Sequence, residues 1–262
     1  GMMDTIGASA ATNSIQDLDL AHLIMVVGAN PTESHPVVGA RIKQAHRRGV
    51  PLIVIDPRRT EVADLADLHL ALRPGTDAFL LGAMLAMIVA RRGYDDEFLA
   101  AHTTGWEQVR TELERVPVDA WLAAADIPRE RAEAAADMII GAASMTVRVD
   151  VGVQQSRNST LNAYLEKLLF LITGNFLRPG CNGLHTWLAP MWGHSRPGSI
   201  DVVTRQARIA GLSPPNDMPK AILTDHPDRI RAMFVDSGNP ANSVADTNAV
   251  EKALSSLDLL VV

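Results

Sequence analysis

Four polar side chains follow short apolar runs of the chain, at points where strands would end. They are Asn30, Asp56 with Arg58, and Asp77. Nucleotides often bind where the carboxyl ends of parallel strands meet. An acidic residue at such a strand end can hydrogen-bond a ribose hydroxyl of the nucleotide. A guanidinium can pair with a phosphate through two parallel hydrogen bonds. The pattern predicts a nucleotide site, although a surface salt bridge between Asp56 and Arg58 would need no ligand.

Asp77 has the chemistry to distinguish one purine from the other. It follows Pro74-Gly75-Thr76 at a predicted strand-to-helix turn. A carboxylate can accept hydrogen bonds from both N1–H and the 2-amino group of guanine, a pair of donors that adenine lacks. As a helix N-cap it would need no ligand, so that alternative stays open. Gln154 and Gln155 end a later strand, where their amides could bond a ring rich in donors and acceptors.

One device of strand, loop, helix and strand occurs twice. The first copy spans residues 23–56 and the second spans residues 232–262, each with an Asn-Pro-x-x-Ser loop at 30–34 or 239–243. One such loop would favour a simple helix cap, but two copies predict two related binding halves. Neither loop has the second and third glycines of the dinucleotide fingerprint. The second copy stops before any counterpart of residues 56–58, so we expect the chain to be the interior of a larger protein.

Apolar strands that alternate with helices predict an α/β fold. We expect a Rossmann-like parallel sheet flanked by helices, followed by part of a second related α/β domain. The predicted divisions are a lead-in segment at 1–20, a Rossmann-like α/β domain at 21–144, and a partial second α/β domain with long loops at 145–262. The longest apolar run, 78–90, is shorter than a membrane span and predicts a buried helix.

Composition excludes several classes of function. The chain has 262 residues, 47% of them hydrophobic, and a net charge of −6 without a basic face, which argues against nucleic acid as a partner. Cys181 is the only cysteine, so an internal disulfide, a Cys-x-x-Cys zinc site and an iron–sulfur cluster held by this segment are excluded. The eight histidines show no ligand spacing, so we assign no metal ligand and no catalytic residue. No secretory signal is visible, and we expect a cytoplasmic protein.

The motifs, taken in order, resemble those of the molybdopterin oxidoreductases of the dimethyl sulfoxide reductase family, which include formate dehydrogenases and nitrate reductases. The resemblance implies two molybdopterin guanine dinucleotides that hold one molybdenum or tungsten atom between two pseudo-symmetric α/β domains. It also implies a 4Fe-4S cluster, a metal-ligating Cys, selenocysteine or Ser, and a C-terminal β-barrel domain elsewhere in the intact protein. The motifs that carry it are residues 28–36, 55–58, 73–77, 173–175, 178–180 and 238–240.

The resemblance assigns residues to two cofactor arms. One guanosine diphosphate arm would be held by Gly28, Asn30, Glu33, Asp56, Arg58, Gly75 and Asp77, and the other pterin or its nucleotide by Gly152, Gln155, Gly238 and Asn239. Pro31, Pro57 and Gln154 complete the predicted set of cofactor-binding residues.

These observations predict the central cofactor-binding region of a molybdenum- or tungsten-dependent oxidoreductase. The intact enzyme would perform two-electron chemistry on a small-molecule substrate, and the isolated segment would be inactive. Its partners would be the remaining domains of its own polypeptide and an electron-transfer subunit, with no nucleic acid and no membrane span. Two alternatives are a non-catalytic nucleotide-binding or assembly module and the middle α/β domain of a thiamin-dependent enzyme.

Overall fold

A computed structural model describes residues 14–156, 158–182, 200–208 and 213–262, and the chain divides into two compact units, Gly1–Thr186 and Trp187–Val262. Each unit is described by itself. The first contains α2 (Asp17–Leu20), β1 (Leu23–Val27), α3 (Pro31–Ser34), α4 (Pro36–Arg47), β2 (Leu52–Ile55), α5 (Glu61–Leu65), β3 (Leu68–Leu70), α6 (Asp77–Ala90), α7 (Asp96–His102), α8 (Trp106–Glu114), α9 (Val118–Ala125), α10 (Arg129–Gly141), β4 (Met145–Val149), α11 (Val151–Gln154) and α12 (Ser159–Ile172).

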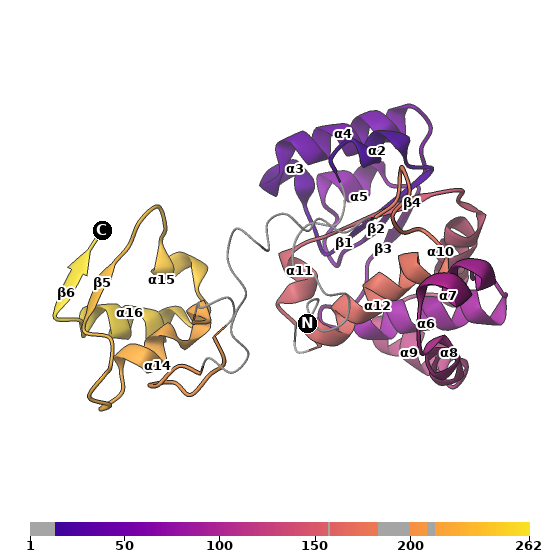
Figure 1. The fold of residues 1–262 in the computed structure, drawn as a ribbon. Helices are drawn as coiled ribbons and strands as arrows, with labels where there is room; N and C mark the ends of the chain where they lie inside the picture. Colours follow the sequence, from indigo (N-terminus) through magenta and orange to yellow (C-terminus); the bar gives the residue numbers. More distant parts are fainter. Residues whose placement is uncertain (1–13, 157, 183–199, 209–212) are drawn as a thin grey trace. The chain divides into compact units, whose positions relative to one another are not determined.

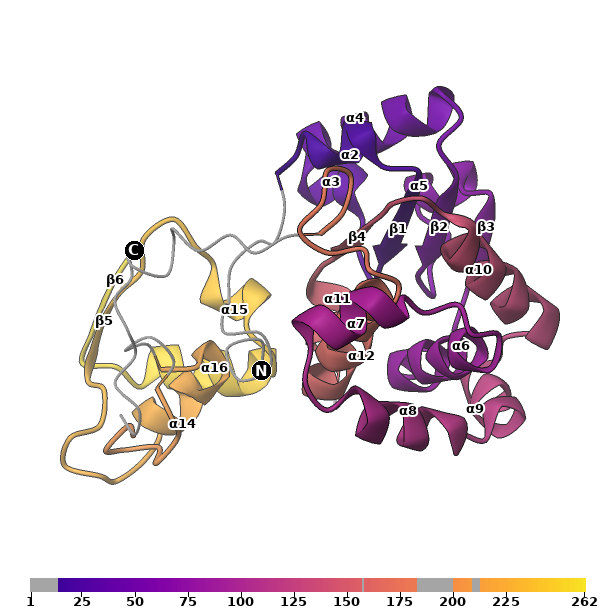
Figure 2. The same ribbon diagram turned by 45° about the vertical axis from the view of Figure 1, so that its right-hand side comes forward.

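Four parallel strands of the first unit form a sheet in the order β3-β2-β1-β4. Helices lie on both sides of it, as Figures 1 and 2 show, and β1 is therefore buried along its whole length. Leu23, Met25 and Val27 of β1 pack into one core, whereas Ile24 and Val26 pack into the other. The predicted parallel sheet flanked by helices is confirmed.

The two faces of the sheet carry cores of different size. Helices α2, α4 and α5 cover one face and supply a small core. The other face is covered by α6 with α8, α9, α10 and α12, which form the larger core. Helix α6 is buried from Asp77 to Val89 with only Phe79 partly exposed, which confirms the predicted buried helix. The strands beneath the loops that follow them are therefore packed on both faces.

Two asparagine side chains pair with the outer edge of β4. The Asn175 Oδ1 accepts a hydrogen bond from the Met145 N–H at 2.9 Å, and the Asn182 Oδ1 accepts one from the Val147 N–H at 2.8 Å. The Asn182 Nδ2 donates to the Val147 carbonyl at 3.1 Å. These amides occupy the positions of a neighbouring strand and protect an edge that would otherwise be open to pairing. Asn175, which belongs to the sequence motif at 173–175, and Asn182 thus have a structural role.

The predicted boundary near residue 144 is corrected by the pairing of β4. This strand lies beside β1 with Leu23 opposite Met145 and Val27 opposite Val149, so it belongs to the first sheet. The two units separate between Thr186 and Trp187 instead. The residues of a strand that follows a long helical stretch do not show which strand will be its neighbour. The pairing of β4 with β1 places it in the first sheet.

The second unit holds the second copy of the strand-loop-helix device. Its strands β5 (Ala232–Phe234) and β6 (Leu259–Val261) pair in parallel, and a helix between them buries Val250 and Ala253. The connection runs through two helices, as between β1 and β2. These two helices are α15 (Pro240–Ser243) and α16 (Thr247–Ser255), of which α16 carries Val250 and Ala253. The unit also contains a 3₁₀ turn at Pro215–Asp217 and α14 (Met218–Ile222).

Candidate cofactor-binding site

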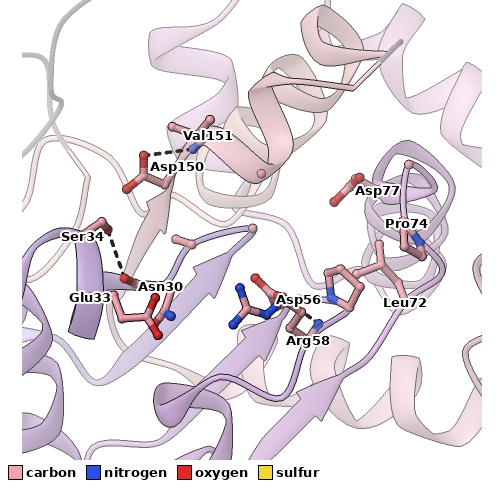
Figure 3. Close-up of a pocket in the computed structure, with 15 residues that line it drawn as sticks. Asn30, Glu33, Ser34, Asp56, Arg58, Leu72, Pro74, Asp77, Asp150 and Val151 are labelled. Atoms are coloured by element: carbon pink, nitrogen blue, oxygen red, sulfur yellow. Dashed lines mark hydrogen bonds between the residues drawn. The ribbon is translucent and has the colours of Figure 1, made fainter. Parts of the chain in front are cut away.

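One cavity of about 400 Å³ lies at the carboxyl ends of all four strands of the first sheet (Figure 3). Each strand contributes the loop that follows it, so residues far apart in the sequence share one wall. The cavity brings Asn30, Asp56 and Asp77 together, as the strand-end pattern predicts. The complete lining is Gly28, Ala29, Asn30, Glu33, Ser34, Asp56, Pro57, Arg58, Leu72, Pro74, Gly75, Asp77, Asp150, Val151 and Gly152.

The loop after β1 is shaped by Gly28 and Asn30. Gly28 has a left-handed φ of +54°, and its N–H donates to the Ile55 carbonyl at 2.8 Å. The Asn30 carbonyl accepts from the N–H groups of Glu33 at 3.1 Å and Ser34 at 3.0 Å, which starts helix α3. The loop is therefore held in place by its own backbone before any ligand binds.

The two polar atoms of the Asn30 side-chain amide differ in their hydrogen bonding. Its Oδ1 accepts a hydrogen bond from the Thr32 hydroxyl at 2.7 Å, which orients the amide. Its Nδ2 is buried and has no hydrogen-bond partner among the residues that the structure describes. A buried donor without an acceptor is costly, so such a group at a cavity wall fits a polar ligand.

Asp56 and Arg58 follow β2. Asp56 is 9% exposed, and its Oδ1 accepts a hydrogen bond from the Arg58 N–H at 2.8 Å. Among the described residues the Arg58 guanidinium forms no ion pair. The alternative of a surface salt bridge between these two residues is therefore not seen in the described part of the chain, and the guanidinium remains available to an anion.

Asp77 begins helix α6 and is 6% exposed, and Figure 3 shows its carboxyl group directed into the cavity. Burial raises the pKa of Asp77, and the negative charge of Asp56 raises it further, while a hydrogen bond with its own backbone lowers it. An ionised Asp77 is thus stabilised by a ligand that donates hydrogen bonds to it.

Gly152 brings the loop after β4 against the loop after β1. Its N–H donates to the Gly28 carbonyl at 3.1 Å, and a Cβ on Gly152 would lie 2.6 Å from that oxygen. A Cβ on Gly28 would lie 2.6 Å from a methyl carbon of Val153. The loop after β1 lacks the later glycines of the dinucleotide fingerprint. Gly152, in the loop after β4, nevertheless lets the two loop backbones approach closely.

Sequence reasoning missed Asp150, which lines the cavity from the start of α11. Its Oδ1 accepts from the Val151 N–H at 2.9 Å, and its Oδ2 lies 3.1 Å from Arg148 Nη2 and 3.3 Å from His35 Nδ1. The available signal was its place directly after an apolar strand. Also missed were Ala29, Ser34, Leu72, Pro74 and Val151.

The remaining predicted residues lie outside this cavity. Pro31 is buried at the start of α3, Gln154 ends α11, and Gln155 follows it with its N–H on the Val151 carbonyl at 3.0 Å. Gly238 and Asn239 belong to the second unit. Gly152, assigned by resemblance to the other cofactor arm, lines the first cavity together with the residues assigned to the first arm.

The second copy of the loop folds as the first does. Ser237 has the same left-handed φ of 54° as Gly28. The Asn239 carbonyl accepts from the N–H groups of Asn242 and Ser243, both at 3.0 Å, and from the Ser243 hydroxyl at 2.8 Å. The duplication seen in the sequence is therefore a duplication of structure.

A family model for molybdopterin oxidoreductases matches residues 2–262. The chain belongs to this family. The family resemblance drawn from the order of the motifs is thereby confirmed. Membership implies a molybdopterin cofactor that carries molybdenum or tungsten. The lining described above fits such a group. Considering the described ranges alone, Asn30 Nδ2 is a buried donor without an acceptor, and no atom lies within 4 Å of the position that a Cβ would take on Gly75, whose φ is +80°.

Curated relatives of this molybdopterin oxidoreductase chain include formate dehydrogenases. It is 31% identical to F420-dependent formate dehydrogenase 1 subunit alpha of Methanococcus maripaludis, over 100% of this chain and 41% of that protein. It is 28% identical to formate dehydrogenase H of Escherichia coli, over 100% of this chain and 39% of that protein. The nitrate reductase of Synechocystis is 26% identical over 95% of this chain. The chain thus spans about two fifths of the length of these relatives.

A solved structure shares the fold. Acetylene hydratase from Pelobacter acetylenicus superposes with a TM-score of 0.76 at 22% identity, over 96% of this chain and 39% of that one. The comparisons favour neither the assembly module nor the thiamin-dependent domain.

None of the described helices is long and apolar enough to cross a membrane. Within the same residues, no three or more His, Cys, Asp and Glu side chains gather as metal ligands.

Proposed function

We propose that the cavity of the first unit binds the guanosine diphosphate arm of a molybdopterin guanine dinucleotide. The observation that carries this proposal is the convergence of Asn30, Asp56 and Asp77 on one cavity, where the Asn30 Nδ2 has no partner within the described part of the chain. Four strand ends, glycine turns and one unpaired guanidinium are the parts from which sites for nucleotide phosphates are built.

Each polar group of the wall has a role in this proposal. The Asp77 carboxylate accepts from N1–H and the 2-amino group of guanine, and Asp56 accepts from a ribose hydroxyl. The Arg58 guanidinium and the Asn30 amide donate to diphosphate oxygens. Because burial disfavours the ionised form of Asp77, two donors of guanine replace the water that this carboxylate loses.

In the intact enzyme, the bound cofactor supplies two-electron redox chemistry at molybdenum or tungsten. The residues of this chain bind and orient it, and the remaining domains of the polypeptide complete the site. Gly238 and Asn239, in the duplicated loop, serve the second cofactor arm. The substrate is a small molecule of the kind handled by the formate dehydrogenases to which the chain is similar.

Titration calorimetry of the 262-residue chain with guanosine diphosphate and adenosine diphosphate tests the proposal. We expect the guanine form to bind more tightly, by roughly 1–3 kcal/mol for a two-bond base contact. Asp77→Asn removes one acceptor and should abolish the preference. Glu130→Gln, an exposed carboxylate on α10, is the matched control and should retain it. Equal binding of both nucleotides by the unaltered chain would contradict the assignment of Asp77.

An activity assay tests the prediction that the isolated segment is inactive because the residue that ligates the metal lies in another part of the intact protein. The isolated chain, supplied with cofactor, formate or nitrate, and an artificial electron carrier, should show no turnover. Turnover at the rate of an intact enzyme would show that this segment holds a complete active site.

A further inference from the structure

His69 contacts the cavity loop without lining the cavity. It lies in β3, and its Nε2 is 2.8 Å from the carbonyl oxygen of Asp56. A carbonyl oxygen accepts hydrogen bonds and cannot donate them, so Nε2 carries the proton and the imidazole is the donor. The contact joins the edge strand of the sheet to the end of β2, where the residues proposed to bind ribose and phosphate begin.

We propose that His69 is a positioning residue that fixes the Asp56–Pro57 peptide for nucleotide binding. This inference rests on the proposed function for its effect on affinity, but its effect on the loop stands on the structure of the free chain. His69 touches no ligand in this account. It acts through the carbonyl of Asp56.

Pro57 makes the hydrogen bond from His69 to the Asp56 carbonyl important for holding this peptide. Pro57 has no N–H, so the peptide unit between Asp56 and Pro57 can be anchored only through its carbonyl oxygen. The neighbouring groups are already engaged, since the Asp56 N–H donates to the Leu70 carbonyl at 3.3 Å and the Arg58 N–H donates to Asp56 Oδ1 at 2.8 Å. The ring of Pro57 restricts rotation on one side of this peptide, and without His69 its carbonyl oxygen would lose the hydrogen bond that ties it to β3.

The backbone of His69 is itself held. The Nη2 of Arg131, in α10, donates to the His69 carbonyl at 2.5 Å. His69 and Arg131 line a second cavity of about 460 Å³ with Arg59, Asp67 and Asp126, none of which lines the first. A chain of contacts thus runs from α10 through β3 to Asp56, and neither Arg131 nor His69 belongs to the lining of the first cavity.

Three variants separate a positioning role from simple packing. His69→Leu keeps an apolar side chain but removes the donor, whereas the amide of His69→Gln can donate to the same carbonyl. His46→Leu is the matched control, because the Nδ1 of His46 lies 3.1 Å from the Val50 carbonyl and 3.6 Å from Asp67, while His46 itself lines neither cavity. Hydrogen exchange of the Arg58 amide is measured in the free chain, and affinity for guanosine diphosphate is measured by calorimetry.

We expect His69→Leu to exchange the Arg58 amide about tenfold faster and to bind guanosine diphosphate about tenfold more weakly. His69→Gln should recover most of both effects, and His46→Leu should change neither. Unchanged exchange and affinity in a folded His69→Leu chain would overturn the inference while leaving the proposed function intact. Faster exchange in a chain whose unaltered form binds no guanosine diphosphate would instead overturn the proposed function and keep the loop role.

One measurement needs no variant. Nitrogen NMR of the unaltered chain near pH 8 reports which ring nitrogen of His69 carries the proton. The Nε2–H form is expected, and a neutral ring protonated only at Nδ1 would overturn the inference.

Discussion

The N–H of Gly152 donates to the carbonyl oxygen of Gly28 at 3.1 Å, which joins the loops that follow β4 and β1. These residues are far apart in the sequence, and the approach is so close that neither position has room for a Cβ. The wall of the cavity therefore depends on two glycines from different strands, and the first prediction concerns their contact.

Gly152→Ala should weaken nucleotide binding and destabilise the first unit. The new Cβ would lie 2.6 Å from the Gly28 oxygen, so the loops must separate, and overpacking of this kind costs roughly 1–3 kcal/mol. Gly141→Ala is the control, because no atom lies within 4 Å of its Cβ position. Urea unfolding and calorimetry of both variants measure the effect. Equal stability of the two variants would show that the loops are not locked together.

Asp77→Asn should stabilise the free chain at neutral pH. Burial raises the pKa of Asp77 above its ordinary value of 3.8, so the folded state holds this proton more tightly than the unfolded state. Stability associated with Asp77 is therefore present at low pH and is lost as the pH rises through the raised pKa. Asparagine does not titrate, so its advantage should grow from pH 3.5 to pH 7. Unfolding curves across this range that favour aspartate at pH 7 would contradict the shift.

Asn175→Ala should destabilise the sheet edge by roughly 1–3 kcal/mol, since the Met145 N–H would be left buried without an acceptor. Asn158→Ala removes an exposed asparagine that makes no side-chain cap and should change stability by less than about 0.5 kcal/mol. Thermal unfolding compares the two. A cost of the same size at both positions would refute the role of Asn175 at the edge.

Glu166 and Lys167 form an ion pair whose side chains are 1% and 6% exposed. Burial raises the pKa of Glu166, and the charge of Lys167 opposes that rise. Lys167→Met leaves the buried carboxyl group without its partner and should cost roughly 3–5 kcal/mol.

Two further variants define the origin of that cost. Adding Glu166→Gln to Lys167→Met should return part of the lost stability. Arg115→Met, which breaks an exposed pair with Glu112, should cost less than about 1 kcal/mol. A Lys167→Met chain as stable as the unaltered one would show that the pair contributes nothing.

The sequence predicts those parts of the fold that depend on local pattern. The first copy of the device could be drawn because its strands are uninterrupted apolar runs and because Asn30 and Pro31 favour a loop that opens a helix. The convergence of Asn30, Asp56 and Asp77 followed from the geometry of parallel strands, in which every strand end meets the same edge. Such inferences need no knowledge of distant contacts.

Long-range pairing could not be predicted in the same way. The residues of β4 do not indicate that β1 is their neighbour, so the second domain was predicted to begin too early. Asp150 was not singled out in the sequence, and the position of β4 beside β1 brings it to the cavity. The contact of His69 with Asp56 likewise depends on strand order, which a run of apolar residues does not specify.

The most direct test of the central claim is amide NMR of the chain during titration with guanosine diphosphate. The account predicts saturable shifts at Gly28, Asn30, Arg58 and Gly75, together with the side-chain amide of Asn30, and weaker shifts with adenosine diphosphate. Saturable shifts that miss these residues, or shifts spread over two separate regions of the first unit, would contradict a single guanine nucleotide site at the carboxyl ends of its four strands.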